Sequence, residues 1–180
     1  ELTKSLSFDG VTTAKGNYNV ADTAPVTFAW SCIGQHSDLV NPARFMTFMG
    51  AIANGGSAAE PYIMEKVECG SESTYEADTR STGRLMSRET ADQVRAYMRK
   101  NTELVYGDYN FPGLKVCAKS GTSQLGGGQK SNAMFSGFVD SEEYPLAFMV
   151  VVENGGYGGQ ACIPIISKVL AECKLVLDGK

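Results

Sequence analysis

The sequence predicts an α/β domain of the α+β type, in which an antiparallel sheet is flanked by helices. Two stretches between residues 41 and 107 place apolar residues at helical spacing, and residues 114–153 contain three short apolar runs typical of strands. Residues 163–177 return to helical spacing. With 180 residues and 43% hydrophobic content, the chain is long enough for one core but too short for two full domains.

Residues 1–30 are rich in Thr, Gly, Asn and Asp, and we expect them to form a connector of loops and short extended segments. Residues 31–110 are predicted to be the helical part. Their first helix is predicted to begin at Pro42 with Asn41 as its N-cap, and to end at the Asn-Gly-Gly of residues 54–56.

A strand is predicted in "PYIMEKVEC", followed by a polar loop or hairpin over residues 70–83. The second helix is predicted to begin near Ser87, a suitable N-cap, and to end by Gly107. Residues 111–180 are predicted to form three antiparallel strands, "LKVCAKSGTSQ", "NAMFSGFVD" and "LAFMVVVEN", and a terminal helix, "IPIISKVLAECKLVL". The apolar face of that helix is expected to pack on the sheet.

Charge and hydropathy exclude several kinds of partner. Sixteen Lys and Arg against twenty Asp and Glu give a net charge of -4 without a basic stripe, so no nucleic-acid partner is expected. No run reaches the roughly 18 to 20 apolar residues that a membrane span needs. The start, "ELTKSLSFDG", has neither an initiator Met nor a signal pattern, and we therefore expect a piece of a longer chain.

The five cysteines are odd in number and widely spaced, and the chain has one His. No C-x-x-C pair occurs, so the sequence predicts neither a zinc site nor a complete disulfide framework. We expect most of the thiols to be buried.

A cluster of polar residues lies near the end of the first strand of residues 111–180: Lys119, Ser120, Gly121 and Thr122. A phosphate-binding loop is rejected by its spacing, because Gly127 stands where G-x-x-x-x-G-K-[ST] needs its lysine. A second interpretation makes Lys119 a solvated residue at the start of a wide bend. A third gives the cluster chemistry, since an ammonium and two hydroxyls bind a substrate carboxylate and a glycine lets a substrate backbone lie along the strand.

The third interpretation is favoured because the chain resembles the C-terminal portion of a penicillin-binding protein transpeptidase domain. "CIGQHSDLVNPARFMTFMGAIANGG" resembles the family's Ile-Gly-Gln-Gly segment and the Thr-Pro-capped helix after it, and "AKSGTSQ" resembles its Lys-[Thr/Ser]-Gly element. "FSGFVDSEEYPLAFMVVVENGGYGGQACIPIISKVL" resembles the family's hairpin and last helix. His36 and Asn41 replace the usual Gly and Thr, and we expect His36 to be a loop residue rather than a catalytic base.

The resemblance implies that residues 1–180 are part of a peptidoglycan D,D-transpeptidase domain, which cross-links cell-wall peptides through a serine acyl-enzyme. The implied partners are a stem peptide ending in D-Ala-D-Ala and β-lactams, on the extracytoplasmic face of the bacterial membrane, with no metal or organic cofactor. Catalytic roles fall on Lys119, Ser120 and Thr122, and substrate contacts on Ser120, Gly121, Thr122 and Ser123. The Thr122 N–H is expected to be one of two oxyanion donors.

Acylation in this family needs a Ser-x-x-Lys nucleophile and a Ser-x-Asn element, and neither spacing occurs in the chain. We expect both elements, and a membrane anchor, in a preceding part of the protein, so that these 180 residues alone are inactive. Their uncovered surfaces are expected to self-associate. The alternatives are a nonenzymatic relative that binds the cell wall, a β-lactam sensor domain and a serine β-lactamase.

Overall fold

A three-stranded antiparallel sheet is the central element of the computed structural model, which describes residues 2–8, 10–18, 24–70 and 72–179. Its order is β5-β6-β7, which confirms the three predicted antiparallel strands, and "SEEYP" lies in the connection between the last two. The strands are β5 (Val116–Ser123), β6 (Asn132–Val139) and β7 (Ala147–Val152).

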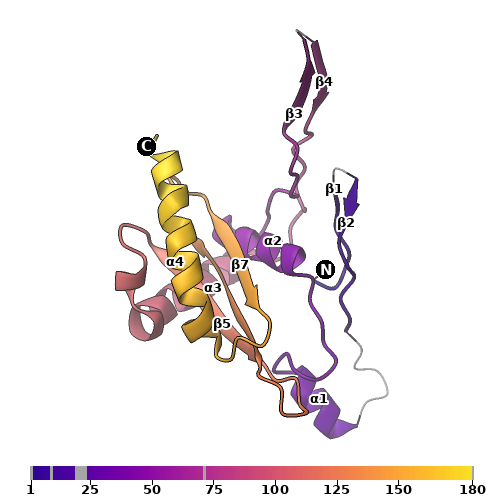
Figure 1. Cartoon of the computed structure of the whole chain (residues 1–180), viewed down its shortest axis with the longest axis vertical. Coiled ribbons are helices and arrows are strands. Elements are labelled where there is room, and N and C mark those ends of the chain that lie inside the picture. Colours follow the sequence, from indigo (N-terminus) through magenta and orange to yellow (C-terminus); the bar gives the residue numbers. More distant parts are fainter. Residues whose placement is uncertain (1, 9, 19–23, 71, 180) are drawn as a thin grey trace.

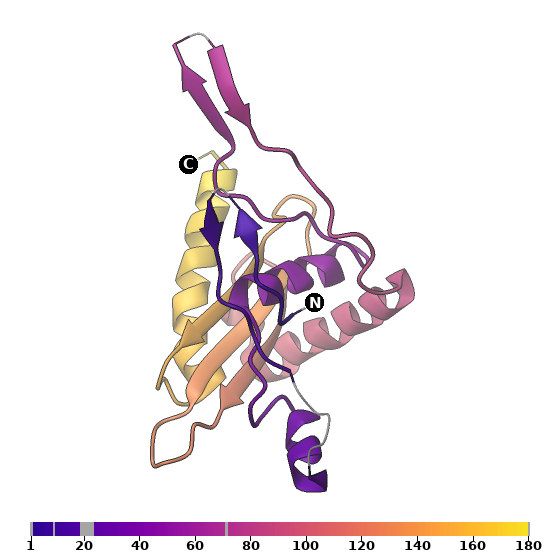
Figure 2. The ribbon, with the colours of Figure 1, turned by 90° about the vertical axis from the view of Figure 1, so that its right-hand side faces the viewer.

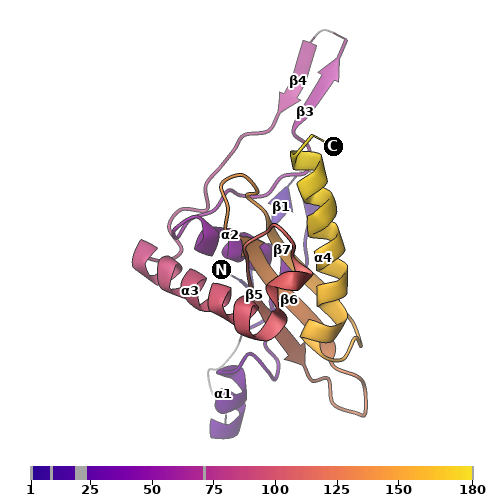
Figure 3. The ribbon, with the colours of Figure 1, turned by 90° about the vertical axis from the view of Figure 1, so that its left-hand side faces the viewer.

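Helices cover both faces of this sheet, which confirms the predicted α+β architecture (Figure 1 and Figure 3). One face packs against α4 (Gly158–Leu177), and the other against α2 (Pro42–Ala53) and α3 (Arg88–Asn101).

Side chains that alternate along β5 divide the core into two layers. Val116 and Ala118 belong to the layer under α4, which contains Phe135 and Ile166. Cys117, between them in sequence, belongs to the layer under α2 and α3. This period of two fixes the face on which each later residue of β5 lies.

Both predicted helix caps are present. The Asn41 side chain accepts from the backbone N–H of Ala43 at 3.0 Å, and the Ser87 Oγ accepts from that of Thr90 at 3.1 Å. Beyond α3 the chain continues as a π-helix, Thr102–Tyr106, and then as a 3-10 turn, Asp108–Asn110.

Two helix predictions need correction. The terminal helix begins at Gly158, five residues before the predicted start, and Pro164 lies inside it. The first turn of α4 packs against β5 and β6. The stabilisation from this packing exceeds the cost of the backbone hydrogen bond that Pro164, which has no N–H, cannot make. The connector contains a helix, α1 (Pro25–Ser31), which has proline at its start and buries no residue.

The other extended segments are small and peripheral. In the connector, β1 (Ser7–Phe8) pairs with β2 (Val11–Thr12); residues 19–23 lie outside the described residues. β3 (Lys66–Cys69) and β4 (Glu72–Glu76) form a hairpin that projects from the body of the molecule with every described residue exposed (Figure 1 and Figure 2). The strand predicted over residues 61–69 is confirmed only from Lys66 onward, and β4 lies within the stretch predicted as a loop or hairpin. No helix among the described residues has the length and apolar character to cross a membrane.

The prediction that most cysteines are buried is wrong. Cys117 and Cys162 are buried and Cys173 is partly exposed, whereas Cys32 and Cys69 are exposed. Cys32 follows α1, and Cys69 lies near the tip of the projecting hairpin, so neither has a core to enter.

Candidate active site at the edge of β5

The four residues of the sequence cluster lie on two faces of β5, an edge strand. Lys119 and Gly121 follow Cys117 on the α2 and α3 side, and Ser120 and Thr122 lie on the α4 side. The ammonium of Lys119 reaches the strand edge, where its Nζ donates to the carbonyl oxygen of Ser120 at 2.6 Å. The edge of the strand is therefore where the charge and the two hydroxyls can act on one ligand.

The first half of this edge is covered by α3. Arg99 Nη1 donates to the Val116 carbonyl oxygen at 2.8 Å, and Asn101 Nδ2 donates to that of Ala118 at 3.1 Å. In an antiparallel edge strand, the N–H and C=O of one residue point toward the neighbouring strand, and those of the next residue point toward the free edge. The contacts made by residues 116 and 118 therefore place the backbone groups of residues 120 and 122 on the open edge as well.

The second half of the edge is more open. The Thr122 carbonyl oxygen accepts from Gln35 Nε2 at 3.0 Å, which ties the loop after α1 to the strand. No residue in the described part of the chain accepts a hydrogen bond from the Thr122 N–H. This N–H is a backbone donor available to a ligand, as the oxyanion role requires.

The two hydroxyls of the cluster both accept hydrogen bonds from neighbouring elements. Tyr106 Oη donates to Ser120 Oγ at 2.9 Å, and the backbone N–H of Gly158, at the start of α4, donates to Thr122 Oγ at 3.2 Å. The same tyrosine oxygen accepts from the Ser120 N–H at 2.7 Å. The side chains of residues 120 and 122 are thus fixed before any ligand arrives.

The remaining predicted site residues show fewer contacts. Ser123 is half-buried at the end of β5. A Cβ added to Gly121 would meet only the Met134 side chain, at 3.4 Å, an ordinary contact, so packing among the described residues does not by itself require glycine there. His36 is exposed in the loop after α1, as expected for a loop residue, with its Nδ1 3.1 Å from Ser37 Oγ.

Cys117, two residues before Lys119, is not an alternative nucleophile. Burial raises the pKa of its thiol to about 12, and the thiolate is the reactive form of cysteine. Its side chain packs in the layer under α2 and α3.

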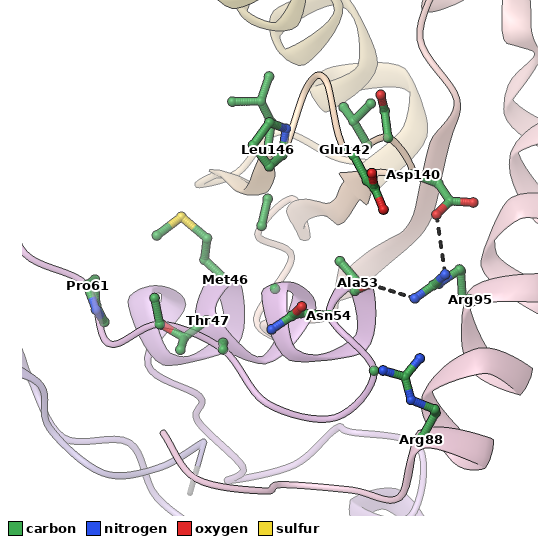
Figure 4. Close-up of a pocket in the computed structure, with 18 residues that line it drawn as sticks. Met46, Thr47, Ala53, Asn54, Pro61, Arg88, Arg95, Asp140, Glu142 and Leu146 are labelled. Atoms are coloured by element: carbon green, nitrogen blue, oxygen red, sulfur yellow. Dashed lines mark hydrogen bonds and ion pairs between the residues drawn. The ribbon is translucent and has the colours of Figure 1, made fainter. Parts of the chain in front are cut away.

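A pocket of about 730 Å³ lies near the other end of β5, between α2, α3 and the β6–β7 turn (Figure 4). Arg95 in this pocket is already engaged, because its guanidinium donates to the Ala53 carbonyl oxygen at 2.6 Å and lies 3.6 Å from Asp140. The pocket includes none of residues 119–123 and is separate from the sequence cluster.

Sequence reasoning missed the supporting residues. Gln35 belongs to the Ile-Gly-Gln segment and could have been suspected from it. Tyr106 and Asn101 belong to no motif, and their contacts with β5 depend on how α3 and the π-helix pack against the strand.

A Lys-Ser-Gly-Thr edge strand, with a terminal helix on one face of its sheet and two helices on the other, defines the class of penicillin-binding transpeptidase domains. Residues 5–171 match the family described as the penicillin binding protein transpeptidase domain. The chain belongs to this family.

Among curated proteins, the chain is 25% identical over 144 residues to the peptidoglycan D,D-transpeptidase PbpA of Mycolicibacterium smegmatis, covering 75% of this chain and 29% of that protein. It is 26% identical over 163 residues to the peptidoglycan D,D-transpeptidase MrdA of Salmonella typhimurium, covering 77% of this chain and 25% of that protein. The chain thus spans about a quarter of the length of these relatives.

Solved structures share the fold. The ceftriaxone acyl-enzyme complex of penicillin-binding protein A from M. tuberculosis matches with a TM-score of 0.79 and 21% identity, over 89% of this chain and 38% of that one. The D,D-transpeptidase domain of a peptidoglycan glycosyltransferase from Eggerthella lenta matches with a TM-score of 0.77 and 20% identity, over 99% of this chain and 46% of that one.

Proposed function

We propose that the protein to which this chain belongs is a peptidoglycan D,D-transpeptidase, and that β5 provides the substrate-binding edge of its active site. The observation that carries the proposal is the open half of the β5 edge. Lys119 Nζ lies 2.6 Å from the Ser120 carbonyl oxygen, two fixed hydroxyls flank Gly121, and the Thr122 N–H has no acceptor among the described residues.

Each group has a role that its chemistry supports. The Lys119 ammonium attracts a substrate carboxylate, and the hydroxyls of Ser120 and Thr122 donate to it. Gly121 and Ser123 border the path along which a peptide strand lies beside β5. The Thr122 N–H is one donor to the oxyanion of the tetrahedral intermediate.

The nucleophile is a serine outside the 180 residues, because the chain contains no Ser-x-x-Lys. Its oxygen forms an ester with the substrate carbonyl carbon, the C–N bond breaks, and the departing amine takes up the serine's proton. An acceptor amine then attacks the ester carbonyl carbon, a new amide bond forms as the C–O bond to the serine breaks, and the proton lost by the amine returns to the serine oxygen. These 180 residues alone are therefore expected to be inactive in acyl transfer.

The substrate proposed is a stem peptide that ends in D-Ala-D-Ala, and β-lactams are proposed to acylate the same serine. Two features support this: the sequence relatives are peptidoglycan D,D-transpeptidases, and penicillin-binding protein A of M. tuberculosis has been solved as a ceftriaxone acyl-enzyme. For such substrates the proposed site lies on the extracytoplasmic face of the bacterial membrane, and we propose that the membrane anchor of the protein lies outside these 180 residues.

Labelling of the complete natural protein with a fluorescent penicillin tests the proposal. The intact protein should form a covalent adduct that survives denaturation. Lys119→Gln should slow labelling by about tenfold or more, since it removes a charged hydrogen-bonding group worth about 1.5–3 kcal/mol. Lys130→Gln is the matched control, because Lys130 is an exposed lysine in the loop between β5 and β6 and should leave the rate unchanged. A folded protein that never labels would refute the assignment.

A further inference from the structure

Tyr106 contacts the candidate site but belongs to none of its motifs. It is the last residue of the π-helix, and the residue is 8% exposed. π-Helical turns are uncommon and occur often at functional sites. The tyrosine oxygen lies 2.7 Å from the Ser120 N and 2.9 Å from the Ser120 Oγ, so it contacts both hydrogen-bond donors of this serine.

We propose that Tyr106 is a positioning residue that directs the hydroxyl proton of Ser120 toward the substrate carboxylate, and thereby sets the preference for substrates with a free carboxylate. The proposal rests on the proposed function, and it assigns Tyr106 a part in substrate selection.

The direction of each hydrogen bond follows from the number of protons available. A backbone N–H can only donate, so the tyrosine oxygen accepts from Ser120 N. Tyr106 has one proton of its own, and Ser120 Oγ is the acceptor within reach. The Ser120 oxygen therefore accepts from the tyrosine, and its own proton is left for another partner.

The reverse arrangement is disfavoured. If Ser120 donated to Tyr106, the tyrosine oxygen would accept two hydrogen bonds, and its own proton would have no acceptor among the described residues. A donor left without a partner in a buried position is costly, because it gives up its hydrogen bond to water and gains none. The first arrangement satisfies every group except the serine proton, which a bound carboxylate can accept.

Tyr106 is well anchored for this purpose. Its ring meets that of Phe135 edge-to-face, with centroids 4.9 Å apart at 77°. Its carbonyl oxygen accepts from Asn110 Nδ2 at 2.7 Å. The ring belongs to the main core layer under α4, so the hydroxyl has little freedom to turn away from Ser120.

The same contact also determines which backbone groups a substrate can use. The Ser120 N–H is already bonded to Tyr106, so the next donor along the open edge is the Thr122 N–H. Thr122 Oγ likewise accepts from Gly158 N, which leaves its proton available. A ligand thus meets two hydroxyl protons beside the Thr122 N–H. Negatively charged carboxylate oxygens satisfy the two hydroxyl donors better than an ester does, and the N–H stays available to the oxyanion.

The test compares two substrates in the complete natural protein: a penicillin with its free carboxylate, and the methyl ester of the same penicillin. Tyr106→Phe removes the hydroxyl and keeps the ring. The second-order acylation rate of the free acid should fall by about tenfold, the equivalent of one hydrogen bond, whereas the ester should react at nearly the wild-type rate. The ratio of acid to ester rates is the readout. Tyr109→Phe is the control, because Tyr109 is 84% exposed nearby and should not change the ratio.

Each other outcome is informative. An unchanged ratio of acid to ester rates would overturn the proposal. If both rates fell equally, Tyr106 would be a packing residue only. In a Ser120→Ala background, Tyr106→Phe should have no further effect on the ratio, because the oriented proton is already absent. If Tyr106→Phe does not fold, Ser120→Ala alone must lower the ratio, and failure to do so overturns the proposal. Absence of labelling in the folded wild-type protein would refute the proposed function instead.

Discussion

Arg99 donates from its Nη1 to the carbonyl oxygen of Val116 at 2.8 Å, so a residue of α3 satisfies an edge group of β5. The same guanidinium also donates to Asp108, and this hydrogen bond raises the pKa of Arg99. The arginine is thus charged at every working pH. It joins α3, the 3-10 turn and the strand that carries the candidate site.

Arg99→Ala should lower the free energy of unfolding by about 1–3 kcal/mol, because it leaves the Val116 carbonyl and Asp108 without their donor. Urea unfolding measures the loss. Arg80→Ala is the matched control: its partner Asp78 is exposed, and removal of this surface ion pair should change stability by about 0.5 kcal/mol or less. Equal effects of the two substitutions would show that the Arg99 contact contributes nothing specific.

Much of the fold could be predicted because its signals are local. Asn41 and Ser87 begin helices through side chains that bond to nearby N–H groups, and the sheet follows from apolar runs joined by a short turn. The start of α4 could not be predicted in this way. Pro164 is a strong local signal for a helix start, but contacts of Gly158 with β5 and β6 move the start upstream.

The candidate site was predictable only in part, for a similar reason. Lys119, Ser120 and Thr122 are adjacent in a recognisable pattern, so the sequence predicts them together. Tyr106 reaches the same place from a π-helix 14 residues away in sequence, and Gln35 from a loop 87 residues away. No periodicity in the sequence encodes these tertiary contacts.

His36 should be replaceable by glycine with a gain in stability of about 0.5–1 kcal/mol. Its φ of 71° lies in the left-handed region, which glycine adopts without the strain of a Cβ. Gly34, two residues earlier, also has a φ of 71° with open space around it, so Gly34→Ala should lower stability by about 1 kcal/mol. Thermal unfolding of both variants checks the pair. A loss of stability in His36→Gly would indicate that the imidazole makes a contact worth more than the strain.

Cys117 should make the protein less stable as the pH rises above about 8.5. The pKa of its thiol is raised to about 12 by burial, whereas an unfolded cysteine titrates near 8.5. Between these values the unfolded state loses a proton that the folded state keeps, so the free energy of unfolding falls with increasing pH.

Cys117→Ala should therefore reduce the decline in stability between pH 7.5 and 10 that urea titrations record, by removing about one proton from the difference between the two states. Cys32→Ala is the control, since Cys32 is exposed and should leave the slope unchanged. A slope that is the same in Cys117→Ala and wild type would contradict the burial argument.

Self-association of the isolated 180 residues is expected to use α4 rather than β5. The β5 edge is partly covered by Arg99, Asn101 and Gln35, whereas Val169 and Val176 on α4 are 48% and 72% exposed. Replacing both valines with lysine should shift light scattering under reducing conditions toward the monomer. Val26→Lys, at an exposed position on α1, should not. A wild-type chain that is monomeric across micromolar concentrations would contradict the expectation.

Gly158 and Gly159 begin the same helix but should respond oppositely to alanine. A Cβ at Gly158 would lie 2.3 Å from the Gly121 carbonyl oxygen and 2.5 Å from that of Met134, and neither backbone group can move freely. Gly158→Ala must push the first turn of α4 away from β5, at a cost of about 1–3 kcal/mol, and weaken the bond from Gly158 N to Thr122 Oγ.

A Cβ at Gly159 would meet its nearest atom, on the Ile163 side chain, at 3.8 Å, an ordinary contact. Gly159→Ala should thus be neutral or stabilising by a few tenths of a kcal/mol, because alanine favours the helix. Urea unfolding separates the two variants, and penicillin labelling of the complete protein should slow only in Gly158→Ala, because only that substitution displaces the donor to Thr122. If Gly158→Ala were as stable and as reactive as Gly159→Ala, the close approach of α4 to β5 would not be what positions Thr122.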